Sequence, residues 1–411
     1  MVKNISIIYI TTLIILVLVY SGLLKTKENY FLYSLLHKEE ITEITGTVYS
    51  NPQKSGNKYL IPINVKQCTD KKNIKSSAKG IVQVIIPKEY VEAFLPGKIY
   101  SNSQKNGGII CEQGFDLVVK GAFKQNNFYC KNAKNLNTSG AVTISKIRGI
   151  LRLQFRRLMF SWGKAGGLFL ALVSGIKDYA DNSLTENFRN SGLSHILALS
   201  GMHLNLVNNA SKKIFNFIKI KYFSSIMQLV CIVLFVWFSG LTPSLYRALL
   251  FSIIGIIVST LKIKDVKMIT ILSASFLIHC VTRPWDLHQI AFMLSYGAIA
   301  GILILSKGTQ MLTENLMPPI ISSSFSASLG AQTFTTPITI KMIGTLCPIG
   351  ILSSMLVSPV ITIFIYFGVI LLILCLLFPV LVPTGAFLMN ILYNIIDKLV
   401  SIFSRFPRLS F

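Results

Sequence analysis

The sequence contains few charged residues and very few acidic ones. Only 14% of its 411 residues are charged, whereas soluble domains usually have about a quarter. The chain holds 40 Lys and Arg against 16 Asp and Glu, which gives a net charge of +24. The scarcity of charge excludes a soluble fold for most of the chain. The basic excess fits cytoplasmic loops beside anionic lipid or attraction to a polyanion such as nucleic acid, and composition leaves both open.

Patterns that bind metals or nucleotides are also missing. The chain has five histidines and seven cysteines, but neither a CxxC pair nor a Cys/His spacing typical of zinc sites, so we expect no metal and no cofactor. It has no GxxxxGK[ST] loop, so we expect no ATPase of its own. Three cysteines precede the main apolar region, namely Cys68, Cys111 and Cys130. In an oxidising compartment two of them could form one disulfide, and the sequence leaves the pair open.

Long apolar runs dominate the remainder and predict a polytopic α-helical membrane protein. Residues 5–24 are expected to form an uncleaved transmembrane helix. The alternative is a signal peptide, because Lys3 precedes the run and Ser21-Gly22 follows it. Basic clusters around the hairpin 223–261 place its ends in the cytoplasm. The clusters are Lys212, Lys213, Lys219 and Lys221, and Lys262, Lys264 and Lys267. The other expected spans are 165–176, 192–208, 268–282, 288–306, 349–378 and 380–402, with a broken region near 320–347.

Residues 25–143 differ, because turn signals separate five or six short strand-like runs. This spacing predicts a small extracytoplasmic β-barrel, for which an OB-like fold is the natural candidate. OB-folds bind single-stranded nucleic acid through basic grooves and stacking aromatic rings. The candidates here are Lys71, Lys72, Lys75 and Lys79, with Tyr59, Phe123, Phe128 and Tyr129. The alternative is a solvated lysine loop beside ordinary core aromatics.

Residues 144–164 are predicted to form a basic amphipathic helix at a membrane interface. Arg148, Arg152 and Arg156 recur every four residues, with Arg157 beside them. The helix would anchor the chain to lipid or contact a polyanion. The remaining segment, 165–411, is the expected multi-span domain, so the predicted domains are 1–24, 25–143, 144–164 and 165–411.

Several apolar stretches of the multi-span domain carry polar groups whose burial in a membrane costs free energy. Residues 189–207, RNSGLSHILALSGMHLNLV, include His195 and His203, and Ser200-Gly201 is expected to break the helix and expose backbone. The alternative is an interhelical hydrogen bond. Arg247 should face a cavity or a partner, or else snorkel to the interface.

Two further stretches are also polar. Asp286, His288 and Arg283 are expected at an interface, with Ser295 and Tyr296 deeper. Gln332 and the threonines after it precede three prolines, Pro337, Pro348 and Pro359, whose expected breaks indicate a pathway through the protein.

The stretch FRNSGLSHILALSGMHL, residues 188–204, resembles the signature of ComEC-type competence proteins, a family that imports transforming DNA across the bacterial inner membrane. TPSLYRA (242–248), the Pro284–Tyr296 stretch and AQTFTTP (331–337) resemble three further family segments. The resemblance covers roughly residues 144–365. It departs from the family pattern at Met293, Gln289 and Ser354, which puts the lining role of 283–296 and 350–359 in doubt. The family's β-lactamase-like H-x-H-x-D-H site is absent from the printed sequence.

The resemblance implies an inner-membrane channel that passes single-stranded DNA into the cytoplasm. A charged strand needs a wide, polar and wetted path. The expected lining residues are His195, Ser200, Gly201, His203, Arg247 and Gln332, none of them catalytic. The implied partners are membrane lipid, an external DNA receptor, a cytoplasmic ATP-dependent helicase-like motor and a separate nuclease.

Three alternatives remain. A small-solute secondary transporter would show inverted repeats and a compact midplane site, and no convincing repeat is visible. An intramembrane enzyme could use His195 or His203 as a base, but no well-placed carboxylate accompanies them. The third alternative is a decayed family member without function.

Overall fold

The structure is a computed structural model that describes residues 2–20, 30–92, 108–136, 143–218, 220 and 222–410. Lys219 and Lys221, to which the sequence assigned a cytoplasmic position, lie outside the described residues. The chain divides into two compact units, residues 28–161 and residues 1–27 with 162–411. Each unit has its own apolar core.

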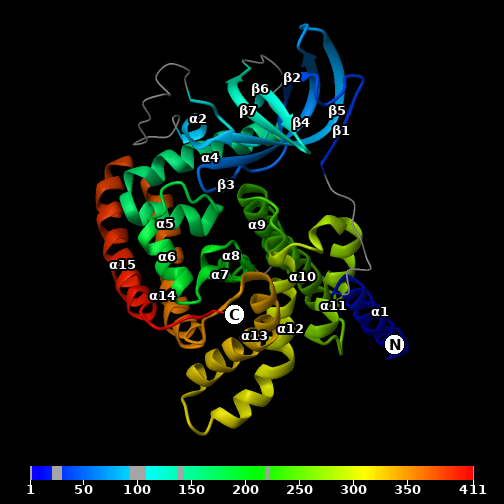
Figure 1. Cartoon of the computed structure of the whole chain (residues 1–411). Helices are drawn as coiled ribbons and strands as arrows, with labels where there is room; N and C mark the ends of the chain where they lie inside the picture. Colours follow the sequence, from blue (N-terminus) through cyan, green and yellow to red (C-terminus); the bar gives the residue numbers. More distant parts are fainter. Residues whose placement is uncertain are drawn as a thin grey trace. The chain divides into compact units, whose positions relative to one another are not determined.

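The first unit is a closed five-stranded β-barrel, and its described residues include the helices α2 and α4 (Figure 1). Its strands pair in the order β2–β4–β5–β7–β6 and back to β2, and only the β5–β7 pair is parallel. Two short strands, β1 and β3, extend the edges at β5 and β4. The elements are β1 (Phe31–Ser34), β2 (Ile41–Val48), β3 (Gln53–Ser55), β4 (Lys58–Asp70), β5 (Lys75–Pro87), α2 (Lys88–Glu92), β6 (Asp116–Lys124), β7 (Asn127–Asn135) and α4 (Ile144–Ser161). The closed barrel confirms the predicted OB-like fold.

Alternating apolar residues explain why the barrel closes. Along β4, Tyr59, Ile61, Ile63 and Val65 are buried on one face. Side chains two residues apart lie on the same side of a strand, so these four side chains share the barrel interior. Phe128 of β7 lies fully buried in the same core.

Helix α4 belongs to the barrel unit, and three of its four arginines, Arg148, Arg152 and Arg156, are buried. Arg152 Nε donates to Glu112 Oε2 at 3.0 Å, and Arg156 Nη2 donates to Glu112 Oε1 at 2.7 Å. Arg148 is also buried and donates to Gln113. These contacts correct the expectation that the arginine stripe faces lipid or a polyanion. The stripe instead neutralises one buried carboxylate, because a buried charge needs a paired partner.

The second unit consists of helices with one small sheet. Four described helical segments are long and apolar enough to cross a membrane, namely Pro243–Thr260, Ile290–Thr313, Gly350–Leu377 and Pro379–Phe403. Together with shorter apolar helices they confirm a polytopic helical membrane protein. The elements are α1 (Val2–Tyr20), α5 (Gly163–Ser174), α6 (Asn182–Asn190), α7 (Ser194–Leu197), α8 (Gly201–Phe215), α9 (Phe223–Ser239), α10 (Pro243–Thr260), α11 (Met268–Thr282), η1 (Pro284–Asp286), α12 (Ile290–Thr313), α13 (Pro319–Ile343), β8 (Thr345–Leu346), α14 (Gly350–Leu377), η2 (Pro379–Leu381), α15 (Val382–Phe403) and β9 (Leu409–Ser410).

Two prolines expected to break the helices do not do so. Pro337 lies inside α13 and Pro359 inside α14, while Pro348 falls in the connection between these helices. The expected broken region 320–347 is therefore mostly one continuous helix. Threonine hydroxyls of α13 donate to carbonyls four residues earlier, as from Thr336 to Gln332 O at 2.7 Å. Such side chains help a membrane helix tolerate proline, so proline count alone did not locate a pathway.

The end of the chain returns to the connection between α13 and α14. Strand β9 pairs with β8 in an antiparallel manner, with Leu409 opposite Leu346. This pairing brings the last described residues beside Cys347. The same connection contacts the segment that carries the two histidines.

Candidate functional site

The polar segment 188–204 is a broken helix, as the sequence predicted. Helix α6 ends at Asn190, the short α7 ends at Leu197, and Ala198 is extended. Ser200 is also extended, with φ −130° and ψ 175°, and α8 begins at Gly201. The break therefore lies at Ser200-Gly201 and presents the N-terminus of a helix of 15 residues.

The first half of this segment packs against the α13–α14 connection. Gly192 has φ +76°, and a Cβ there would lie 3.0 Å from Cys347 Cβ, so a glycine is needed for both reasons. Ser353 Oγ donates to Ser191 O at 2.8 Å. Gln332 Nε2 donates to Cys347 O at 3.0 Å. Gln332 is thus joined to the 188–204 segment through Cys347.

The second half of the segment carries a histidine with one unsatisfied nitrogen. The Ser200 backbone N–H donates to His203 Nδ1 at 3.2 Å, so Nδ1 acts as an acceptor. The proton of a neutral imidazole must then lie on Nε2. That atom is buried and has no hydrogen-bond partner among the described residues, and the whole residue is 3% exposed. A buried donor without an acceptor costs free energy, so the site favours an acceptor supplied from outside.

Arg247 lies against the start of α8. It is 5% exposed, and its Nε and Nη2 both donate to Ser295 Oγ, at 3.1 and 2.7 Å. No carboxylate lies within ion-pair distance of it in the described parts of the chain. A Cβ added to Gly201 would be 3.2 Å from Arg247 Nη2, so the guanidinium packs directly on the glycine.

This arrangement carries uncompensated positive charge. A helix N-terminus bears about half a positive charge, and a cation placed against it is repelled. Burial of an unpaired guanidinium adds a further cost. Ser295 supplies one neutral acceptor only. An anion is the group that would relieve both costs at once, since backbone N–H groups and a guanidinium both bind phosphate oxygens.

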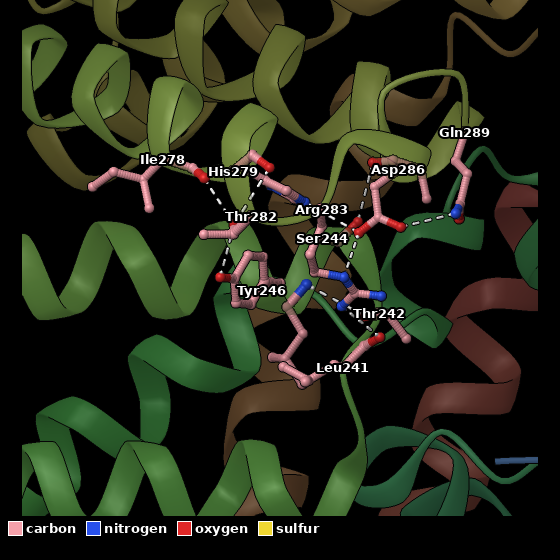
Figure 2. Close-up of polar contacts among 12 residues, drawn as sticks. Leu241, Thr242, Ser244, Tyr246, Ile278, His279, Thr282, Arg283, Asp286 and Gln289 are labelled. Atoms are coloured by element: carbon pink, nitrogen blue, oxygen red, sulfur yellow. Dashed lines mark hydrogen bonds and ion pairs between the residues drawn. The ribbon is translucent and has the colours of Figure 1, made fainter. Parts of the chain in front are cut away.

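A second polar cluster surrounds Asp286, which the sequence placed at a span boundary, and its central side chains are buried in the protein (Figure 2). Asp286 is fully buried and accepts from three side chains: from His279 Nε2 at 3.1 Å, Arg283 Nε at 3.1 Å and Gln289 Nε2 at 3.0 Å. His279 is equally buried and also contacts the Tyr296 hydroxyl at 3.3 Å. Asp286 lies in η1 between α11 and α12, so its expected position at a membrane interface stays a prediction, while its side chain is enclosed by protein. An acidic residue in an apolar run is tolerated only when paired, and that rule is the signal that could have found the cluster.

The cluster also fixes the start of α10, which carries Arg247. Tyr246 Oη donates to Thr282 Oγ1 at 3.0 Å, and Arg283 Nη1 donates to Leu241 O at 3.3 Å (Figure 2). The Arg283 guanidinium also lies 5.4 Å from the Tyr246 ring centroid. Tyr246 precedes Arg247 directly, so these contacts between α10 and α11 hold the arginine in register with Ser295 of α12.

The six expected lining residues therefore do not form one group. Ser200, Gly201, His203 and Arg247 come together, and Gln332 joins the same segment on its other side. His195 is exposed, and its Nδ1 lies 3.2 Å from Gly192 O. No described contact links it with Arg247.

The lysines of the barrel unit are exposed. Lys71 and Lys72 occupy the β4–β5 turn, where Asp70 Oδ1 accepts from the Lys72 N–H at 2.7 Å, while Lys75 and Lys79 lie on β5. An exposed basic surface is present here, as the sequence predicted. Its contact with DNA stays a prediction.

Two of the four aromatic residues expected to stack on DNA are not available for it. Tyr59 and Phe128 are buried in the barrel core, and Phe123 packs partly against it. Tyr129 is half-buried, with lysine ammonium groups 5.5 and 5.8 Å from its ring. Other rings are exposed instead: Phe31 (47%) and Tyr33 (71%) of β1 lie 5.2 Å apart, and Tyr33 faces Lys79 across the strand pair. Sequence pattern missed them because β1 is only four residues long.

The cysteines and acidic residues form no metal site in the described ranges, where no group of three or more His, Cys, Asp or Glu gathers. Cys68, Cys111 and Cys130 are not bonded to one another. Burial raises the pKa of the Cys130 thiol to about 12 and that of Cys68 to about 11. These thiols therefore stay protonated at neutral pH and react slowly.

Comparison with known proteins shows which family this chain is similar to. A family model described as "Competence protein" matches residues 172–411. "ComE operon protein 3" of Bacillus subtilis (strain 168) is 27% identical over 166 residues, which cover 40% of this chain and 21% of that protein. The chain thus matches about a fifth of the length of this curated relative. No solved structure matches.

Proposed function

Because the chain belongs to the Competence protein family, we propose that it acts in DNA uptake and passes single-stranded DNA through the bacterial inner membrane into the cytoplasm. The strand carries one negative charge per nucleotide and cannot cross hydrocarbon without a polar path. The helical unit, with its polar broken segment, would supply that path. The barrel unit would lie outside the cytoplasm and receive the strand.

One observation carries the proposal. Arg247 is buried without a carboxylate partner among the described residues, against the N-terminus of α8. A passing phosphodiester is an anion that would satisfy this arginine and the helix N-terminus. The orphaned His203 Nε2–H is a further donor on the same helix turn. Ser200, Gly201 and Gln332 would shape the same path, and His195 would lie at its exposed side. None of these residues needs a catalytic role.

The proposal implies partners of defined chemistry. A receptor outside would deliver the DNA, a cytoplasmic ATP-dependent helicase-like motor would supply the energy, and a separate nuclease would remove one strand. A small-solute transporter would not need a basic OB-like domain.

Deletion of the gene tests the proposed function directly. We expect the deletion strain to bind fluorescent DNA at its surface while the cytoplasmic signal disappears, and a plasmid copy to restore it. Undiminished cytoplasmic DNA in the deletion strain would contradict the proposal.

We expect the barrel unit to bind single-stranded DNA weakly through its lysines. In a fragment of residues 25–161, replacing Lys71, Lys72, Lys75 and Lys79 with Gln should flatten the slope of log K against log salt by about 0.7 for each phosphate that is no longer neutralised. Tyr33→Ala should cost about 1–3 kcal/mol if the ring stacks on a base. The matched control removes four other exposed lysines, Lys58, Lys124, Lys131 and Lys134. Equal slopes in both quadruple variants would show that Lys71, Lys72, Lys75 and Lys79 form an ordinary solvated surface and do not bind DNA specifically.

We expect His203→Leu to block DNA import while the protein stays inserted in the membrane. His203→Gln is the informative companion, because glutamine is a preferred residue at this capping position and should preserve the bond to the Ser200 N–H. A path role predicts that both variants fail, since both lose the imidazole Nε2–H. A capping role predicts that Gln restores import. The measurement is the uptake of labelled DNA at equal membrane abundance.

A further inference from the structure

The helical unit contains a pocket that differs from the Arg247 site. Its volume is about 290 Å³, near the lower end of the range of small-ligand pockets. It is formed by the connection after α5, by α6 and by α7. The lining residues are Lys177, Asn182, Thr185, Glu186, Arg189, Ser194 and Leu197.

The pocket has an excess of positive charge. Lys177 and Arg189 provide two cations from different elements, and Glu186 is the only acidic residue in the lining. Neither cation forms an ion pair with a described residue. Asn182 and Ser194 add an amide and a hydroxyl, whereas the Thr185 hydroxyl already donates to Asp181 O at 2.9 Å. A guanidinium, an ammonium and neutral donors around one space are typical of phosphate recognition.

We propose that this pocket binds a phosphodiester group of the DNA strand, an inference that rests on the proposed function. Its charge of +1 from the lining complements a group of charge −1. Its volume suits one nucleotide-sized group. Leu197 gives it one apolar wall, against which a sugar or base can pack.

The position of the pocket in the chain favours the strand over a lipid headgroup. Arg189 and Ser194 belong to the same broken segment that leads through Leu197 to Ser200 and Gly201. The backbone of Arg189 is also held in place, because its carbonyl oxygen lies 3.9 Å from Cys347 Sγ and accepts from the Gly192 N–H at 3.3 Å. A strand held here is therefore held by the segment that contacts Arg247.

The test uses the full chain in nanodiscs of zwitterionic lipid, with a fluorescent oligothymidylate as the probe. The four barrel lysines are first replaced by Gln to silence binding there. In this background Lys177→Gln with Arg189→Gln should weaken binding and flatten the salt slope by about 0.7, the value for one single-strand phosphate contact. Glu186→Gln should tighten binding. The matched control, Lys212→Gln with Lys213→Gln, removes the same charge from exposed positions on α8 and should change neither quantity.

The outcomes separate this inference from the proposed function. Wild-type protein that binds no oligonucleotide would overturn the function itself. Binding that is equal in the pocket and control variants would overturn the pocket alone. A parallel preparation contains anionic phosphatidylglycerol, which native mass spectrometry detects. Loss of this lipid from the pocket variant while DNA binding stays would also overturn the pocket proposal, because the pocket would then hold a lipid headgroup.

Discussion

Arg247→Leu should abolish import of labelled DNA while making the protein more stable. A hydrogen bond to a charged group contributes about 1.5–3 kcal/mol, so loss of the phosphate bond should lower strand binding about tenfold to a hundredfold or more. Without a carboxylate partner among the described residues, the guanidinium is a cost to folding, and leucine removes that cost. Function and stability should therefore change in opposite directions. The measurements are cytoplasmic uptake and thermal unfolding in detergent.

Two companions sharpen this experiment. Arg247→Lys keeps the charge but cannot make both bonds to the Ser295 hydroxyl, so import should fall without vanishing. Ser295→Ala leaves the arginine in place but unanchored, and it should also reduce import. If Arg247→Leu at equal membrane abundance imports DNA at the wild-type level, the arginine is merely structural and does not belong to the DNA path.

Glu112→Gln should destabilise the barrel unit by about 3–5 kcal/mol, because it leaves buried arginine charges without their counterion. Arg152 and Arg156 both bond to this carboxylate, and all three side chains are buried. Hydrogen exchange of the barrel strands in the full chain measures the effect. The control is Glu43→Gln, which breaks a more exposed pair with Lys120 at 3.3 Å and should cost no more than about 1 kcal/mol.

The same carboxylate should make the barrel unit sensitive to acid. Burial alone would raise the pKa of Glu112, but the charges of Arg152 and Arg156 and the bond from Arg152 outweigh it and lower the pKa below its usual 4.5. A lowered pKa stabilises the fold at pH above 4.5, and this contribution disappears as the pH falls through the lower, folded value. Acid unfolding of the barrel should lose part of its pH dependence in Glu112→Gln. An unchanged profile would show that other groups control it.

Local pattern was sufficient for many elements of both units, although it missed β1 and predicted a break inside α13. Apolar runs of about 20 residues predicted the helices, because only a helix satisfies its own backbone in lipid. Alternation in stretches such as 58–65 predicted strands of a barrel, since side chains two residues apart share a face. The break at Ser200-Gly201 could also be predicted from the sequence, because a serine followed by a glycine favours a new helix N-terminus.

Pairing between residues far apart in the chain could not be predicted from the sequence, and only the tertiary structure shows it. The arginines of α4 look like a solvent or lipid face until Glu112, some forty residues earlier, turns that face inward. The sequence does not show that His279 and Arg283 enclose the Asp286 carboxylate, or that Arg247 packs beside Gly201 and Ser295. The sequence determines where charge is present. Whether a charge is paired depends on contacts across the fold, and for a buried group that decides between a structural ion pair and a site that still requires an anion.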